Sequence, residues 1–332
     1  MSGAQMDVQA SSGDVPQGRL AFFPIPFFAM VMGMSGLTIG WEKAQHLLGL
    51  DLGITPWLVG FSSLLFLTLA VLYVAKLLRY PQAVLAELRH PVKLNFFPTI
   101  SISLLLLAIA YLPLQPSVSR MLWFAGAGLH LVFTLYIVSA WMHQEHFKVQ
   151  HMNPAWFIPA VGNVLVPIAG VPLGFESISW FFFSVGVLFW LVLLTIIFNR
   201  VLFHNPIEDR LTPTLFILIA PPAVGFIAYT RLVDNLDTFA LVLYFAAMFL
   251  TLLLFSQAGR FLRLRFFLSW WAYSFPLAAF SIASMVMAEQ TGALFYRYFG
   301  VAMLTMLTGI IAILLWSTLR AVLRRGICVP GH

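Results

Sequence analysis

The sequence predicts an all-α integral membrane protein, and three observations lead to this fold class. The 332 residues are 61% hydrophobic and only 9% charged, with a mean hydropathy of +0.93, whereas charged residues make up about 25% of a typical soluble domain. Ten windows of twenty or more residues contain no Asp, Glu, Lys or Arg, and a helix of about 20 residues crosses the hydrocarbon core of a bilayer. The windows are continuously apolar rather than alternating, which excludes an outer-membrane β-barrel.

The ten windows are the predicted transmembrane helices, numbered one to ten along the chain. They span residues 20–41, 52–75, 94–119, 121–144, 149–175, 177–199, 211–230, 238–259, 266–288 and 298–319. Residues 1–19 are largely polar and place no basic stretch ahead of the first window, which predicts a disordered cytoplasmic tail rather than a signal peptide. Residues 20–320 then form one ten-helix domain, followed by a short cytoplasmic tail at 321–332.

The distribution of basic residues predicts how the chain sits in the membrane. If successive connections alternate between the two sides, fourteen Lys and Arg residues lie on the side of the termini and four lie on the other. Because cytoplasmic connections carry an excess of Lys and Arg, both termini are predicted to be cytoplasmic, in a multi-pass protein of the cell inner (plasma) membrane. The net charge of +6 therefore reflects orientation, and no nucleic acid partner is expected.

The prolines divide the ten windows into two alternating sets. The odd-numbered windows contain thirteen of the nineteen prolines, whereas the even-numbered windows contain only Pro56. Proline removes a backbone hydrogen bond, and in a membrane the freed groups must be satisfied by protein or water. The simplest arrangement is five helical hairpins, with the kinked odd helices inside around a central pore and the regular even helices facing lipid. Prolines are also common in membrane helices generally, so the pattern alone does not require a ring.

The interior of the predicted helices carries no charge. Every acidic residue lies in a tail, a connection or a helix end, and no Lys or Arg lies mid-helix. Proton-coupled carriers usually relay protons through intramembrane Asp, Glu or His. The one well-embedded candidate, His130, lies on an even helix and is interpreted as a packing residue. An uncharged pore suits anions that bind weakly, because conduction requires easy exit. Half-helix N-termini would favour anions, although the carbonyls freed by proline oppose this.

The sequence shows no pattern of an enzyme, a metal site or a cofactor site. His143, His146 and His151 are loosely spaced around a connection, with no cysteine or glutamate in a zinc pattern. The lone Cys328 excludes an internal disulfide and a site with several thiolates. Because no nucleophile–base pair, phosphate-binding loop or dinucleotide fingerprint is present, we expect no enzyme activity, no cofactor and no bound metal.

Four short segments, in order along the chain, resemble one family. They are Ala86–Phe97 (AELRHPVKLNFF), Val161–Asn163 (VGN), Ala220–Pro221 (AP) and Trp270–Pro276 (WWAYSFP). In this order within a ten-helix chain, they resemble the plant guard-cell slow anion channels and the bacterial tellurite-resistance/C4-dicarboxylate transporter proteins. The resemblance implies a quasi-five-fold ring of helical hairpins around a pore, assembled as a homotrimer.

The resemblance also implies the position of the gate. The phenylalanine of the ninth-helix motif, Phe275, corresponds to a residue that plugs the pore, and Pro276 beside it bends the local backbone. Hydrophobic constrictions of this kind close by dewetting. Further candidates for the pore wall lie on the odd helices: Gly33, Asn95, Phe96, Pro98, Asn163 and Pro221. The two asparagines either face the pore or satisfy backbone groups freed by proline. Arg89 and Lys93 are expected to supply charge at the cytoplasmic mouth.

These inferences predict an anion channel for small anions of the chloride and nitrate type, with membrane lipid as its surroundings. The alternative is a coupled carrier or exporter for C4-dicarboxylate, sulfite or tellurite-like oxyanions. A membrane scaffold without transport activity is a third class, which fits poorly with a gate motif on a kinked helix.

Overall fold

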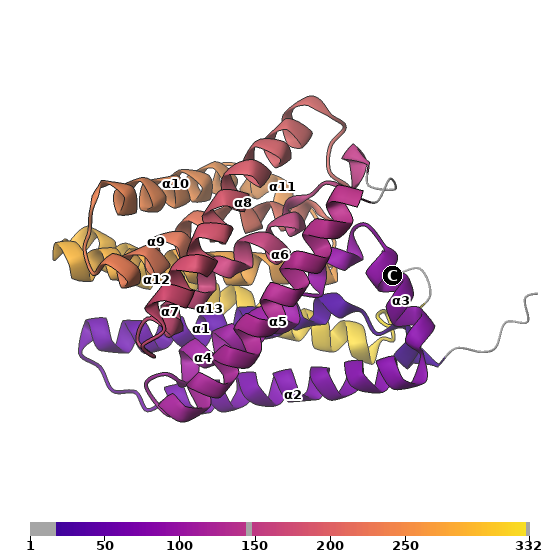
Figure 1. Cartoon of the computed structure of the whole chain (residues 1–332), viewed down its shortest axis with the longest axis horizontal. Helices are drawn as coiled ribbons and strands as arrows, with labels where there is room; N and C mark the ends of the chain where they lie inside the picture. Colours follow the sequence, from indigo (N-terminus) through magenta and orange to yellow (C-terminus); the bar gives the residue numbers. More distant parts are fainter. Residues whose placement is uncertain (1–17, 144–147, 330–332) are drawn as a thin grey trace, which may run out of the picture.

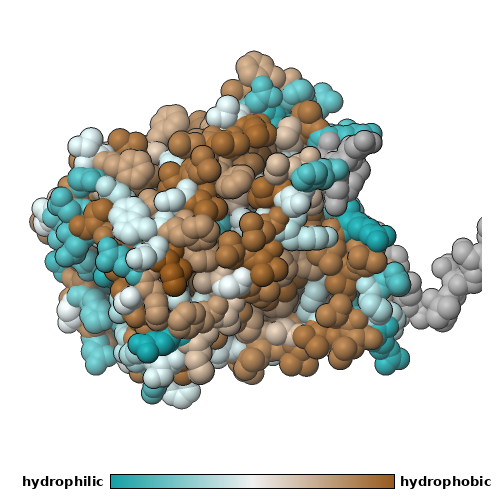
Figure 2. All heavy atoms as spheres, viewed as in Figure 1, coloured by the Kyte–Doolittle hydropathy of each residue, from teal (hydrophilic) through white to brown (hydrophobic). Residues whose placement is uncertain are grey.

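The computed structural model describes residues 18–143 and 148–329, and within these ranges the chain is helical and contains no β-strand (Figure 1). Residues 1–17 of the predicted N-terminal tail and residues 330–332 of the C-terminal tail lie outside the described residues. The prediction of an all-α membrane protein is confirmed, because eight helical stretches are long and apolar enough to cross a bilayer. A band of hydrophobic side chains covers the middle of the molecule between polar ends (Figure 2).

Five of the long helices are uninterrupted, and these correspond to the even-numbered windows. They are α2 (Thr55–Arg79), α5 (Pro116–His143), α8 (Glu176–Phe203), α10 (Thr238–Phe255) and α13 (Leu294–Leu323). Only 22–39% of the apolar part of each is buried inside the protein. Pro116, which falls in the third window of the sequence, begins α5, where a first-turn proline removes no helical hydrogen bond. The low burial of these helices fits a surface that contacts lipid.

The odd-numbered windows fold into helices broken by 3₁₀ turns. They are η2–α1 (Ile25–Phe27 and Phe28–Leu48), η3–α4 (Lys93–Phe96 and Thr99–Tyr111), η5–α6–η6–α7 (Pro154–Trp156, Phe157–Val161, Gly162–Leu165 and Val166–Gly170), η7–α9 (Thr212–Ile219 and Ala220–Val233) and η8–α12 (Leu268–Tyr273 and Ser274–Thr291). We call these the five broken segments. In the three that are long enough to span a membrane by length and composition, 72–78% of the apolar part is buried.

The burial therefore alternates as the proline pattern predicts. Two of the ten predicted windows are not among these eight stretches. Window one forms α1, and window five forms the shorter apolar stretch Pro154–Gly170. The count of ten transmembrane helices therefore stays a prediction. Each broken segment contacts the next one along the chain, and α12 of the last packs against α1 of the first. The described part of the chain thus has a closed series of buried helices with regular helices around it.

A buried ion pair joins α2 to α3 (Pro81–Arg89) at one end of the molecule. Lys76 falls just outside the second apolar window, yet it lies within α2 and its side chain is only 1% exposed. Its Nζ atom is 2.8 Å from Oε2 of Glu87 and donates a hydrogen bond to the carbonyl oxygen of Phe23 at 2.8 Å. The hydroxyl of Tyr73 donates a second hydrogen bond to Glu87, also at 2.8 Å. This cluster attaches the N-terminal segment and α3 to α2.

Candidate functional site

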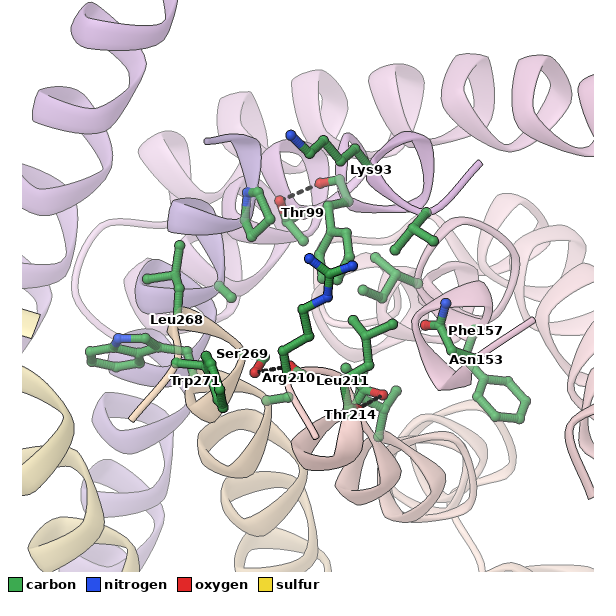
Figure 3. A pocket seen from close by; sticks show the side chains of 18 of the residues that line it. Lys93, Thr99, Asn153, Phe157, Arg210, Leu211, Thr214, Leu268, Ser269 and Trp271 are labelled. Atoms are coloured by element: carbon green, nitrogen blue, oxygen red, sulfur yellow. Dashed lines mark hydrogen bonds between the residues drawn. The ribbon is translucent and has the colours of Figure 1, made fainter. Parts of the chain in front are cut away.

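The five broken segments surround a cavity of about 1340 Å³, which we call the vestibule. All five contribute to its wall, together with the loops around residues 90–92, 150–153 and 205–211 and the residues after α13. Figure 3 shows the side chain of Arg210 extending into the middle of the vestibule, with Lys93 and Thr99 on one side and Leu211 and Thr214 on the other.

The charges on the vestibule wall are mostly positive. Among the described residues that line it, four are Lys or Arg and one is acidic: Lys93, Arg200, Arg210, Arg324 and Glu208. Glu208 is paired with Arg210, whose Nε atom lies 2.7 Å from Oε2 of the carboxylate. The remaining cations have no carboxylate within 4.0 Å among the described residues. An excess of uncompensated cations in a cleft raises the local concentration of anions.

Arg200 contributes a buried positive charge to the vestibule wall. It occupies the last turn of α8, and the residue is 6% exposed. Its Nε atom donates to the carbonyl oxygen of Val149 at 3.1 Å, and its Nη1 atom donates to the carbonyl oxygen of Asn205. These two carbonyl oxygens accept hydrogen bonds from the guanidinium group without neutralising its charge. In the sequence, Arg200 lies in the connection between the windows 177–199 and 211–230. In the fold, its side chain is held in place as a positive charge in the vestibule wall.

The protonation of His90 is consistent with a positive vestibule. Burial is the largest cause that lowers the pKa of His90 from its usual value of 6.5, followed by electrostatic interactions with Lys93, His151 and Arg210. Its Nδ1 atom accepts hydrogen bonds from the backbone N–H groups of Val92 at 3.1 Å and Lys93 at 3.3 Å. The imidazole is therefore neutral at neutral pH, and the positive charge near it comes from its neighbours.

Phe275 lies at the inner end of the vestibule. A second cavity of about 30 Å³, which we call the inner chamber, is lined by residues of the same five segments. Three residues line both cavities and so stand between them, namely Leu165, Val224 and Phe275. Phe275 is in the first turn of α12, directly after the junction with η8, and it is half-buried. Together these three side chains form an apolar constriction.

The predicted site residues fall into two groups in the structure. Lys93, Phe96, Pro221 and Pro276 line the vestibule with Phe275. The others are absent from the walls of both cavities: Gly33, Arg89, Asn95, Pro98 and Asn163.

The residues of the second group have local structural contacts instead. The Nδ2 atoms of Asn95 and Asn163 donate to the carbonyl oxygens of Pro91 at 3.0 Å and Ala160 at 2.7 Å, so these amides satisfy backbone groups near the breaks. Gly33 faces α12, where a Cβ atom would lie 2.2 Å from Oγ of Ser274. The absence of a side chain at Gly33 lets α1 and α12 approach closely.

His130 occupies the packing position that the sequence analysis favours. It is fully buried on α5, and its Nδ1 atom is 2.9 Å from Oγ of Ser101 on α4. No group of three potential metal ligands occurs among the described residues, and His146 of the histidine set lies outside them.

Several residues of the site have no signal in the sequence. Arg200, Arg210 and Arg324 sit at helix ends or in connections, as many basic residues of membrane proteins do. Leu165 and Val224 are ordinary aliphatic residues of apolar windows. Only the packing of the broken segments shows which of these side chains face the cavities.

A helical membrane protein with buried, broken helices around a basic vestibule that narrows at an aromatic side chain has the architecture of a channel or transporter. Comparison with known families assigns it more closely. Residues 22–319 match the profile of the voltage-dependent anion channel family, SLAC1, and the chain belongs to this family.

The chain is similar to plant, archaeal and bacterial proteins. It is 29% identical to S-type anion channel SLAH2 of Arabidopsis thaliana over 85% of this chain and 56% of the plant protein. It is 27% identical to the uncharacterized transporter MJ0762 of Methanocaldococcus jannaschii, over 86% of this chain and 90% of the archaeal one. A tellurite resistance protein TehA homolog of Haemophilus influenzae is 25% identical over 77% of this chain and 79% of its own length. The chain spans about half the length of the plant relatives, SLAH2 and SLAH3.

Proposed function

We propose that this protein is an anion channel for small anions of the chloride and nitrate type, closed at Phe275. One observation carries the proposal: a basic vestibule and an apolar inner chamber, both lined by the same five segments, meet at this phenylalanine. In this proposal ten transmembrane helices form a quasi-five-fold ring, the vestibule faces the cytoplasm with both termini, and three copies assemble in the inner membrane.

The proposed mechanism uses charge to attract anions and an uncharged passage to let them leave. Lys93, Arg200 and Arg324, the lining cations without a carboxylate partner among the described residues, raise the anion concentration in the vestibule. No ionisable residue lines the inner chamber in the described part of the chain, so an anion meets no strong site there. Conduction is fast only where binding is weak enough for exit. The channel opens when the Phe275 ring swings aside, and the proposal includes no enzyme step.

The printed names of the relatives include both anion channels and transporters, so a coupled carrier for oxyanions is the competing function. Purified protein in liposomes distinguishes them. For a channel, we expect currents that vary smoothly with voltage and do not respond to a pH gradient. The size of the current should change when chloride is replaced by nitrate. Flux that is stoichiometric with protons and saturates at carrier rates would contradict the channel proposal.

The ring arrangement predicts which helices contact water. In a background with Cys328→Ser, a cysteine at Ile217, on the vestibule wall, is expected to react readily with an anionic methanethiosulfonate. A cysteine at Phe249, on α10 and 63% exposed, is expected to resist because it faces lipid, where the reagent does not dissolve. Mass spectrometry of the labelled protein in vesicles measures both rates. Equal reactivity at the two positions would exclude the arrangement.

A further inference from the structure

The inner chamber is lined by the five broken segments at the same helical spacing. Each segment contributes two residues three positions apart: Gly36 and Ile39, Leu106 and Ile109, Leu165 and Ile168, Val224 and Ile227, and Ala279 and Ile282. Residues three apart lie on the same face of a helix. The first member varies from glycine to leucine, whereas the second member is isoleucine in all five segments. We call these five side chains the isoleucine layer.

The same register extends toward the vestibule. Four positions before the first member of each pair are Met32, Ile102, Val161, Ala220 and Phe275, and all five line the vestibule. Phe275 therefore belongs to the layer at the inner end of the vestibule, and Ile282 lies seven residues further along the same helix. At 1.5 Å per residue, the isoleucine layer is about 10 Å beyond Phe275 along the axis.

The space between these two layers is small and apolar. The inner chamber has a volume of about 30 Å³, and none of the residues that line it is polar. A water molecule in a buried site needs two to four polar partners, and an apolar cavity of this size stays dry. Moving the Phe275 ring aside removes one obstacle, but the other residues that line the chamber, including all five isoleucines, remain apolar.

We propose that the isoleucine layer is a second hydrophobic constriction in series with Phe275. The predicted effect of this constriction on anion current rests on the proposed channel function. Its effect as a barrier to water and to water-soluble reagents does not. In the resting protein Phe275 limits passage, so changes in the isoleucine layer have little effect. Once Phe275 is removed, the isoleucine layer limits passage, because a hydrophobic constriction conducts only when it is wetted.

Currents test this dependence. Threonine keeps the β-branch and adds a hydroxyl group, so Ile168→Thr with Ile227→Thr wets the isoleucine layer with little change of backbone preference. We expect the pair to raise anion current about fivefold in the Phe275→Ala protein and less than about twofold in the unmodified protein, because only the unblocked path is limited by wetting. The matched control is Ile313→Thr on the lipid-facing side of α13, where Ile313 is 57% exposed. This substitution should not change the anion current in either the Phe275→Ala protein or the unmodified protein. A folded protein with all three substitutions that conducts no more than Phe275→Ala would overturn the proposal.

Thiol modification tests the barrier without relying on conduction. Ala279 lies between the two layers. In a Cys328→Ser background, Ala279→Cys is exposed to an anionic methanethiosulfonate added on the side opposite the vestibule. We expect slow reaction with the isoleucine layer intact, and reaction about tenfold faster with Ile168→Thr and Ile227→Thr, since the added hydroxyls supply hydrogen bonds to entering water. Equally fast reaction with the layer intact would overturn the proposal. Absence of current in every variant, with this labelling pattern preserved, would instead contradict the channel function.

Discussion

Phe275→Ala is expected to raise the basal anion current by about tenfold or more, because a hydrophobic plug forces an ion to give up hydration without replacement. Phe275 stands between the vestibule and the inner chamber with Leu165 and Val224. Its ring offers no hydrogen bond to a passing anion. Every 1.4 kcal/mol removed from such a barrier increases the rate about tenfold. Alanine removes the ring, and as a good helix former it leaves the first turn of α12 intact.

The size of the side chain is expected to set the size of the effect. Phe275→Leu should give a smaller gain than Phe275→Ala, because leucine still fills part of the constriction. Phe182, on α8, is buried but lines neither cavity, so Phe182→Ala is a matched loss of one buried phenyl group. Currents from equal amounts of purified protein in planar bilayers measure all three. If Phe275→Ala is folded and conducts no more than the unmodified protein, Phe275 is not the gate.

Glu87→Gln is expected to destabilise the protein by about 3–5 kcal/mol, the usual cost of leaving one charge of a buried ion pair without its partner. The side chains of Lys76 and Glu87 are 1% and 9% exposed, so water does not replace the lost carboxylate charge. Glutamine preserves the volume and can still accept the hydrogen bond from Tyr73. The loss therefore reports the uncompensated ammonium group of Lys76.

Thermal unfolding of the detergent-solubilised protein measures this effect. Replacing both partners, with Lys76→Met and Glu87→Met, should recover much of the lost stability, because neither charge then remains buried. Glu208→Gln provides the exposed comparison: Arg210 and Glu208 have side chains that are each 64% exposed, and such pairs contribute about 0–1 kcal/mol. A Glu87→Gln protein that unfolds at the same temperature as Glu208→Gln would show that the buried pair is not stabilising.

The sequence predicted the residues whose chemistry or backbone geometry is unusual. Proline marks the broken segments because inside a helix it removes a backbone hydrogen bond, whereas in a first turn, as at Pro116, it removes none. Phe275 was identified from its motif, and in the structure it stands at the junction of two cavities. For Asn163 the sequence allows two roles, either facing the pore or satisfying a backbone group freed by proline. Its amide bonds to the carbonyl oxygen of Ala160 and to Thr134, because a carbonyl freed near a break requires a donor inside the membrane.

Composition and charge spacing by themselves determined that this is a helical membrane protein, because uncompensated charge is too costly to bury in lipid and is therefore absent from the membrane-spanning windows. The distribution of the prolines divides these windows into two alternating sets. Tertiary structure alone decided which apolar and basic side chains line the two cavities. Arg200 becomes a buried positive charge only when carbonyl groups of Val149 and Asn205 reach it. The isoleucines of the inner chamber are indistinguishable from other apolar residues until five segments, distant along the chain, bring them around one cavity. The identity of an apolar side chain does not show whether it points into a cavity, toward a neighbouring helix or toward lipid. Its orientation is set by how the helices pack.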